Sequence, residues 1–184
     1  MITRRLTMTT SAYVTNEVKS YIGNEGPEII SDPIDRSEIR RFIQAIMDQD
    51  PIHWDDEHVK NTRYGSIVAP PLFVTHWFRT PPGIPDPLSE NFKKDPQFDG
   101  LLREKNGPEL PDIPLKRALN GGNEIEFFRY PEVGERISAK GKIVDIFEKE
   151  GRSGRLVFIV TETTFKGYEN NKIILIARQT LIKR

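Results

Sequence analysis

Asp48 and His53 are the residues whose types and spacing could do chemistry. They stand five positions apart, with Pro51 between them. Proline biases the residue before it to an extended conformation, so we expect the chain to reverse here and the two side chains to converge. A carboxylate and an imidazole together can hold a water, take its proton and return a proton elsewhere. The ordinary histidine pKa of about 6.5 suits that exchange at neutral pH. The pair is therefore a candidate acid/base site.

A structural interpretation of the same pair stays open at this point. Asp48 could simply cap or terminate a helix, and His53 could be a packed loop histidine, because a carboxylate and a histidine are common neighbours. A metal site is a weaker alternative. His53 and His58 lie close to Asp55 and Asp56, but the spacing of metalloprotease histidines is absent. We expect no metal, and we expect His58 to be a solvated helix residue.

The residues ahead of Asp48 predict an amphipathic helix that would position it. Asp35 and Glu38 offer a capping box at its start, and Pro51 should end it. Five apolar residues repeat with helical spacing and would share one face: Ile39, Phe42, Ile43, Ile46 and Met47.

Two further helices and a turn are expected after His53. A short helix from about 55 to 61 has acidic residues at its N-terminal end. Tyr64 and Gly65 then turn the chain. Pro70 and Pro71 open a segment, 72–78, that is apolar on all sides. Proline is compatible with a first helical turn and all-round apolarity indicates burial, so this segment predicts a central helix wrapped by sheet.

Eight of the fourteen prolines lie between residues 81 and 114. A long irregular connection of this kind is usually a lid or a binding loop when it is ordered, whereas a disordered linker is the alternative. We favour a lid, because strands resume directly after it and no second domain follows. The sequence thus predicts a single domain over residues 1–184, with a Pro-rich insert at about 81–114.

The C-terminal part predicts an antiparallel meander. Strand-like runs cover 136–148, 156–165 and 172–182, separated by turn-forming Gly and Asn residues, and 124–129 alternates in the same way. One buried helix with a long curved antiparallel sheet is α+β architecture, and a hot-dog fold suits it best.

Composition narrows the classes of function. The 184 residues carry 27 basic and 27 acidic side chains and no cysteine. Zero net charge gives no electrostatic reason to expect nucleic acid or an anionic membrane as partner. Absent cysteines exclude disulfides and thiolate catalysis and favour a reducing compartment. No apolar run reaches the ~20 residues of a membrane span, and no signal-peptide pattern is present. We expect a cytoplasmic protein.

The stretch Asp48-Gln49-Asp50-Pro51-Ile52-His53 resembles the signature of MaoC-type (R)-specific enoyl-CoA hydratases, Asp-x-Asn-Pro-(Leu/Ile/Val)-His. The surrounding motifs are more similar to the FAS1-like dehydratase N-terminal branch of that superfamily. They occur in order across most of the chain: Tyr21-Ile22-Gly23, Arg41 to Ile46, Trp54-Asp55, Thr62-Arg63-Tyr64-Gly65, Val68-Ala69-Pro70-Pro71, Gly121-Gly122 and Gly151 to Gly154.

This resemblance implies a reaction and a partner. Asp48 and His53 would activate one water for addition to a 2-enoyl thioester of CoA or acyl-carrier protein, or would run the reverse dehydration. No cofactor is implied, and the active unit would be a homodimer or heterodimer of hot-dog subunits. A thioesterase, also available to this fold, lacks its motifs here.

The sequence departs from the hydratase pattern at two positions. Asp50 replaces the Asn of the signature. Pro71 stands where the typical hydratase has a Gly whose N–H serves the oxyanion, and proline has no N–H. The Leu72 N–H is the substitute we expect, because first-turn amides are unsatisfied and favoured by the helix dipole. Tyr64 and Gly65 are expected to border the substrate, and His76 is expected to pack or to line the acyl pocket.

The Ala-Pro-Pro pattern keeps an alternative open. It also resembles subunits that only hold the acyl chain while a partner subunit supplies the catalysis, so the chain could be the non-catalytic acyl-chain-binding subunit of a two-component MaoC-type dehydratase. Many such subunits have lost the histidine. This chain retains both Asp48 and His53, which favours a catalytic role.

Overall fold

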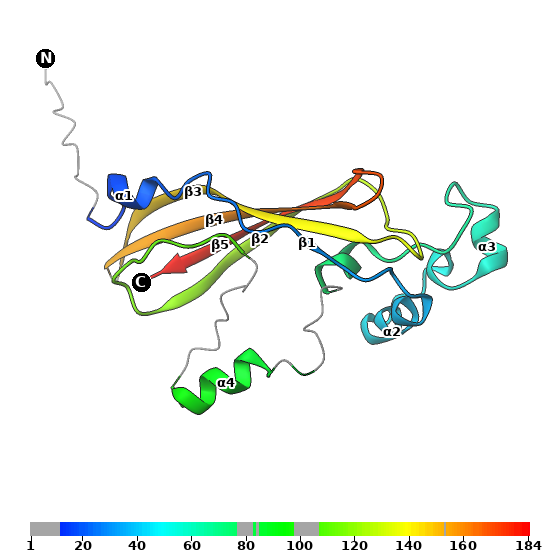
Figure 1. Cartoon of the computed structure of the whole chain (residues 1–184), viewed down its shortest axis with the longest axis horizontal. Coiled ribbons are helices and arrows are strands. Elements are labelled where there is room, and N and C mark those ends of the chain that lie inside the picture. The colour runs from blue at the N-terminus through cyan, green and yellow to red at the C-terminus, as the bar shows by residue number, and fades with distance from the viewer. Residues whose placement is uncertain (1–11, 77–82, 84, 98–106, 153) are drawn as a thin grey trace, which may run out of the picture.

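The computed structural model describes residues 12–76, 83, 85–97, 107–152 and 154–184, and structural statements refer to these residues. They form a five-stranded antiparallel sheet with short helices around it (Figure 1). The strands run in the order β1-β3-β4-β5-β2 across the sheet. Their bounds are Ile29–Ile30 for β1, Ala118–Phe127 for β2, Ile137–Gly151 for β3, Gly154–Gly167 for β4 and Ile173–Lys183 for β5.

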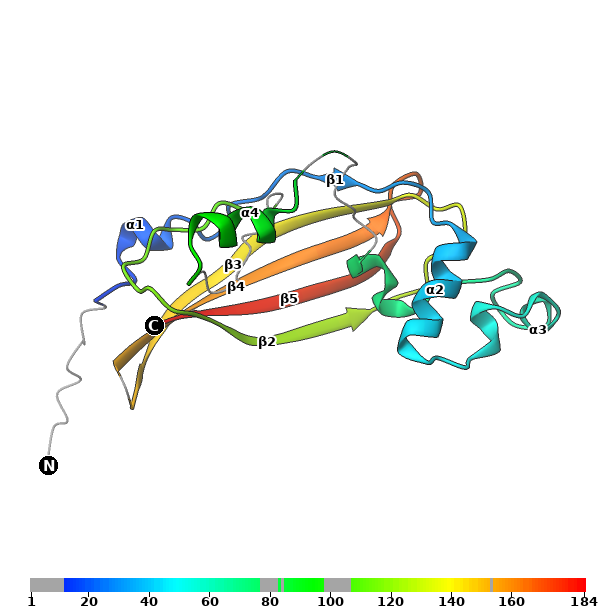
Figure 2. The same cartoon turned by 90° about the horizontal axis from the view of Figure 1, so that it is seen from below.

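Four α-helices and two 3-10 helices accompany the sheet. The α-helices are α1 (Asn16–Lys19), α2 (Arg36–Ile46), α3 (Asp56–Lys60) and α4 (Pro87–Lys94), and the 3-10 helices are η1 (Pro51–His53) and η2 (Pro71–His76). Figure 1 shows α1 at one end of the sheet and α2 and α3 at the other. Seen from the side of α4, the long strands β3, β4, β5 and β2 lie side by side (Figure 2). The architecture is α+β.

The three long C-terminal strands confirm the predicted meander. β3 and β4 are joined at Gly151 and Gly154, and β4 pairs with β5 over nearly its whole length. β3 contains a bulge between Ile143 and Asp145. Because a bulge adds one residue to one strand, it places Ile146 on the same buried face as Ile143 although they are three positions apart. The strand alternation in the sequence did not predict this bulge.

Two apolar clusters fill the two ends of the sheet. One joins α2 and η2 to the strands, with Ile39 and Ile43 of α2, Phe73 of η2 and Leu175 of β5 among its members. The other joins α1 to β3 and β4 and includes Val18 and Ile113. The C-terminal end of the Pro-rich insert, at Ile113, therefore packs onto the sheet. The first cluster is the one that supports Asp48 and His53, since Ile52 belongs to it.

Helix α2 has the predicted start but ends earlier than predicted. The Asp35 side chain caps it by accepting a hydrogen bond from the Ser37 N–H at 2.7 Å. Its end is set by Met47 (φ 56°) rather than by Pro51, and the Asp48 N–H returns to the Ile43 carbonyl at 3.0 Å. A left-handed residue with such a returning bond terminates a helix. Because Met47 is not a glycine, no residue type in the sequence predicted this turn.

The predicted apolar face of α2 is correct only in part. Ile39 and Ile43 are buried and Phe42 packs against their cluster. Ile46 is 50% exposed and Met47 82% exposed. Met47 lies beyond the helix, where its φ of 56° turns the chain. These two exposed residues directly precede Asp48 in the sequence.

The predicted central helix differs from the structure in two ways. Residues 71–76 form the 3-10 helix η2, and only Phe73 and Val74 of it are buried. Leu72 and His76 are exposed, because η2 packs into the core through Phe73 and Val74 alone. Residues 77 and 78 of the predicted segment lie outside the described residues.

The sequence patterns did not predict the start of β2, the helix α4, or the short elements α1 and β1. β2 begins at Ala118, several residues before the predicted alternation, and a bulge at Asn120–Gly122 interrupts its pairing with β5. The insert contains α4, capped by the Asp86 side chain, which accepts from the Ser89 N–H at 3.0 Å. Asp86 followed by Pro87 was the available signal, since both residue types favour a helix start. The single-domain boundary and the lid stay predictions.

Within the described ranges, no helix is long and apolar enough to cross a membrane.

Candidate active site

His53 lies at the end of η1, a 3-10 helix that local sequence builds. The Asp50 side chain caps η1 by accepting from the Ile52 N–H at 3.1 Å. Pro51 occupies the first helical position, where its fixed φ suits the turn. The cap and the proline together hold His53 in a buried position, with 4% of its surface exposed.

The hydrogen bond of the buried ring fixes its tautomer. His53 Nδ1 lies 2.7 Å from the Val68 carbonyl oxygen. A carbonyl oxygen only accepts, so Nδ1 carries the proton. In the neutral ring Nε2 therefore holds the free lone pair. The imidazole is set up to receive a proton at Nε2.

Asp48 faces this nitrogen from the end of α2. Its Oδ2 lies 3.8 Å from His53 Nε2, while its Oδ1 accepts from the Asp50 N–H at 3.0 Å. The Asp48 side chain is 31% exposed. The two side chains therefore meet as predicted, with the carboxylate on the solvent side and the ring on the buried side.

The 3.8 Å separation leaves both groups free for a third atom. It exceeds the N···O distance of a direct hydrogen bond. The Asp48 carboxylate and the His53 Nε2 are therefore not hydrogen-bonded to each other. One oxygen atom at about 2.8 Å from both Oδ2 and Nε2 satisfies this geometry. Such an oxygen could be a water or the hydroxyl of a substrate, and the pair could exchange protons with it.

Tyr130 packs against His53, and Tyr64 and Arg63 stack behind Tyr130. The sequence reasoning missed Tyr130. The Tyr130 ring lies 5.8 Å from the His53 ring, measured between centroids, and Tyr64 stacks on Tyr130 at 5.3 Å. Arg63 covers the Tyr64 ring at 4.9 Å and donates to its hydroxyl at 2.7 Å. Tyr64 is thus close to the site through Tyr130. Tyr130 lies far along the chain after β2, and no spacing pattern connected it to His53.

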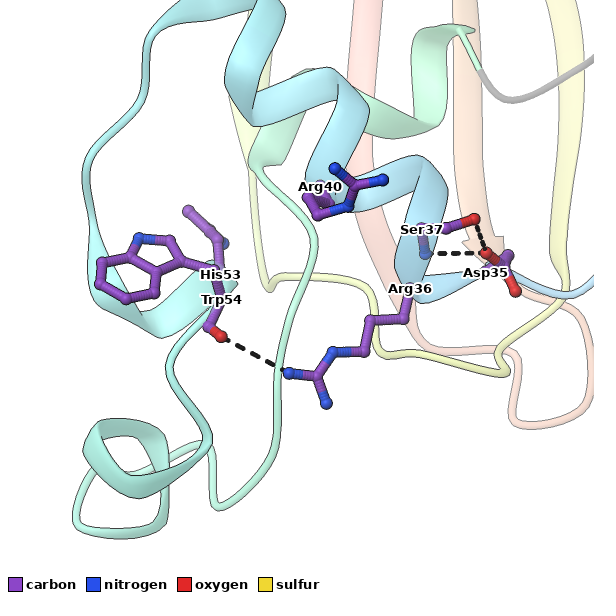
Figure 3. A pocket seen from close by; sticks show the side chains of 6 residues that line it. All are labelled: Asp35, Arg36, Ser37, Arg40, His53 and Trp54. Carbon is purple, nitrogen blue, oxygen red and sulfur yellow. Dashed lines mark hydrogen bonds between the residues drawn. The ribbon is translucent and has the colours of Figure 1, made fainter.

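A hollow of about 460 Å³ opens beside His53 on the side of the α2 N-terminus. Figure 3 shows Arg36 reaching from α2 to the Trp54 carbonyl oxygen, at 3.5 Å. Arg36 also pairs with Asp56 at 2.6 Å and so ties α2 to α3. Asp48 does not line this hollow, which is lined by Asp35, Arg36, Ser37, Arg40, His53 and Trp54.

The other predicted site residues have different surroundings. Leu72 is exposed in η2, and the His76 ring packs 5.8 Å from the Phe42 ring of α2. Gly65 forms the turn beside Tyr64 with a φ of 71°, in the left-handed region that favours glycine. His58 is exposed on α3, as expected. Across the described part of the chain, His, Asp and Glu form no cluster of three that could hold a metal.

Comparison with known families shows to which family the chain belongs. The family model described as "FAS1-like, dehydratase domain region" matches residues 20–175. The chain belongs to this family. The expected membership in the MaoC-like superfamily is confirmed. This superfamily is one of hydratases and dehydratases.

Relatives and solved structures agree with this assignment. A UPF0336 protein of Saccharopolyspora erythraea is 24% identical over 90% of both chains. The 3-oxo-4,17-pregnadiene-20-carboxyl-CoA hydratase alpha subunit of Mycobacterium tuberculosis is 33% identical over 67% of this chain, but over only 36% of that subunit.

Among solved structures, a chain of the ChsH1-ChsH2 complex from Mycobacterium tuberculosis has a TM-score of 0.64 at 20% identity, covering 91% of this chain and 86% of that one. The (R)-hydratase from A. caviae has a TM-score of 0.55 at 11% identity, with 87% and 94% covered. These likenesses confirm the predicted α+β hot-dog fold.

Proposed function

We propose that this protein hydrates the double bond of a 2-enoyl thioester, or dehydrates the corresponding 3-hydroxyacyl thioester, with Asp48 and His53 as the acid/base pair. The observation that carries this proposal is the His53 ring, whose Nδ1 donates to Val68 while Nε2 faces the Asp48 carboxylate across 3.8 Å. Membership in the dehydratase family supports the reaction class.

In the hydration direction a water lies between the two groups. His53 Nε2 takes one water proton as the water oxygen bonds to the β-carbon of the enoyl group, and the electron pair moves toward the thioester oxygen. The protonated His53 Nε2 then gives this proton to the α-carbon, which restores the neutral thioester and the neutral imidazole. Asp48 orients the water and stabilises the imidazolium. The thioester oxygen needs a hydrogen-bond donor while it carries charge.

We assign that donor to the Leu72 N–H. Leu72 is the second residue of η2, and the first N–H groups of a helix have no acceptor within it. Pro71 has no N–H to offer. Tyr64, Gly65 and His76 are proposed to border the bound acyl thioester. We also propose that the reaction is (R)-specific, that CoA carries the acyl group, and that the protein is cytoplasmic.

A direct assay tests the proposed pair. Purified protein is given crotonyl-CoA and longer 2-enoyl-CoAs while the absorbance of the conjugated enoyl group is followed. Asp48→Asn and His53→Gln should each lower the rate by about 10²–10⁴-fold, the range of acid/base catalysis. Asp145→Asn and His58→Gln change exposed side chains of the same types and should leave the rate unchanged. Full activity of Asp48→Asn or His53→Gln would exclude the assignment.

A second candidate function is favoured by Pro71. A chain without the usual oxyanion N–H could hold the acyl thioester while a second hot-dog subunit does the chemistry. The relative from Mycobacterium tuberculosis is named an alpha subunit, and the ChsH1-ChsH2 structure is a complex. Calorimetric titration with a 2-enoyl-CoA separates the two functions. Binding without turnover, unchanged in Asp48→Asn and His53→Gln, would support the acyl-binding subunit.

A further inference from the structure

Tyr130 contacts the proposed catalytic ring, although the proposed mechanism gives it no role. It follows the end of β2, and its ring lies 5.8 Å from the His53 ring with 56° between the planes. Tyr130 is partly buried against the apolar cluster that holds α2 and η2. The tyrosine ring is therefore a direct packing neighbour of the imidazole.

The residues directly after Tyr130 hold the acceptor of the His53 hydrogen bond. The Pro131 carbonyl accepts from the Ala69 N–H at 2.8 Å, and Val68 forms a β-bridge with Glu132. Val68 supplies the carbonyl to which His53 Nδ1 donates. One short segment thus contacts the ring through a side chain and fixes the ring's hydrogen-bond partner through its backbone.

The far side of Tyr130 is supported in turn. Tyr64 stacks on it with 23° between the ring planes, and Arg63 closes the stack. Burial raises the pKa of Tyr130, and the neighbouring Tyr64 and Asp50 raise it further. The phenol therefore stays neutral where histidine titrates, so Tyr130 brings no added charge to the pair.

We infer that Tyr130 is a positioning residue for His53. Its ring blocks rotation of the imidazole and so keeps Nδ1 on the Val68 carbonyl and Nε2 toward Asp48. Packing of the ring, rather than the Tyr130 hydroxyl, performs this role. The inference rests on the proposed function for its effect on rate, whereas its effect on the His53 tautomer is independent of any activity.

The tautomer is measured by ¹⁵N NMR of the imidazole nitrogens at about pH 8, where an ordinary histidine is neutral. The chain has three histidines, and loss of signals in His53→Gln assigns those of His53. Wild-type protein should show Nδ1 protonated and Nε2 unprotonated. Tyr130→Leu should shift both signals toward their average, whereas Tyr130→Phe should retain the wild-type positions. Tyr168→Leu is the matched control, because that tyrosine packs against Arg136.

Two results would overturn the inference: an unchanged His53 spectrum in folded Tyr130→Leu, or averaged signals in Tyr130→Phe, which would assign the effect to the hydroxyl. If Tyr130→Leu does not fold, Tyr64→Leu removes the supporting ring instead, and an unchanged spectrum there counts against the inference in the same way.

The enoyl-CoA hydration rate gives the second readout. Misplacement of a catalytic group by about 1 Å can cost 10²-fold, so Tyr130→Leu should lower kcat by about 10–10²-fold while KM changes little. If Tyr130→Leu changes the tautomer but the wild-type protein has no hydratase activity, the inference stands and the proposed function is rejected. A lowered rate with an unchanged tautomer would do the reverse.

Discussion

Asp50 stands between the two proposed catalytic residues but has a structural role in the geometry. Its carboxylate caps η1 through the Ile52 N–H, and its own N–H binds Asp48 Oδ1. The resemblance places an asparagine at this position, and asparagine caps a helix as well as aspartate does. The departure at Asp50 therefore leaves the local fold intact.

Substitution of Asp50 tests this role. Asp50→Asn should change the free energy of unfolding by less than about 0.5 kcal/mol, whereas Asp50→Ala should lower it by about 1 kcal/mol because the cap is lost. Urea denaturation followed by circular dichroism measures both. Loss of hydratase activity in Asp50→Asn would instead make the second carboxylate a participant in the chemistry.

At the scale of the elements, the connection from β2 to β3 is held by an ion pair. Arg129 forms two hydrogen bonds with Glu135, one of them at 2.9 Å, and the Glu132 N–H donates to the same carboxylate at 3.0 Å. The Glu135 side chain is only 9% exposed. Because Tyr130 lies inside this connection, the pair also supports the ring that contacts His53.

Glu135→Gln should lower the free energy of unfolding by about 3 kcal/mol, because it leaves a partly buried cation without its counter-charge. Glu162→Gln is the matched control. Its more exposed pair with Arg178 should be worth less than about 1 kcal/mol. Equal effects of the two substitutions in urea denaturation would contradict this assignment.

The same pair predicts a loss of stability in acid. Burial alone would raise the pKa of Glu135, but hydrogen bonds from Arg129 and Glu132 outweigh burial and lower it. A carboxylate whose pKa is lowered in the folded state stabilises the protein fully above the ordinary value of about 4.3, and this stabilisation disappears as the pH falls through the folded pKa. Urea midpoints measured from pH 6 down to pH 3 should fall less in Glu135→Gln than in the wild type.

The bulge of β2 makes a second prediction at this scale. A Cβ at Gly121 would lie 2.8 Å from Thr180 Cγ2 and 2.9 Å from Ile182 Cγ1 on β5. Gly121→Ala should therefore destabilise the protein by about 1–3 kcal/mol. Thr180→Ser removes the nearest methyl group and should recover part of the loss in the double variant. A purely additive double variant, measured by thermal unfolding, would argue against the contact.

For the whole molecule, the free edge of β2 indicates association. Within the described residues β2 pairs only with β5. Its exposed apolar side chains include Leu119 at 43% and Phe127 at 47%. A long unpaired edge strand is a template for pairing with another chain. An association at this edge would agree with the dimer of hot-dog subunits expected from the resemblance.

Light scattering should give at least twice the chain mass of 21.2 kDa. Leu119→Lys combined with Phe127→Lys should shift the mass toward one chain, because charge is unfavourable in a buried interface core. Ile22→Lys changes a similarly exposed apolar side chain beside β3, away from β2, and should not shift the mass. A monomeric wild-type protein would contradict the prediction.

The sequence alone determined the long C-terminal strands, the start of α2 and the proposed pair. Period-two alternation between Gly and Asn turns located β3, β4 and β5 within a few residues, and the Asp35 cap located the start of α2. Asp48 and His53 were found because a helix end and a proline turn are local features, so residues five apart must lie close together.

Only the tertiary structure decided what surrounds them. The acceptor of the His53 hydrogen bond is the Val68 carbonyl, fifteen residues away, and the ring against His53 belongs to Tyr130. The early end of α2 at Met47 and the exposure of Leu72 were likewise invisible in the sequence. These features depend on contacts between distant segments. Residue spacing encodes local turns and faces, whereas the choice of packing partner is made only when the sheet brings those segments together.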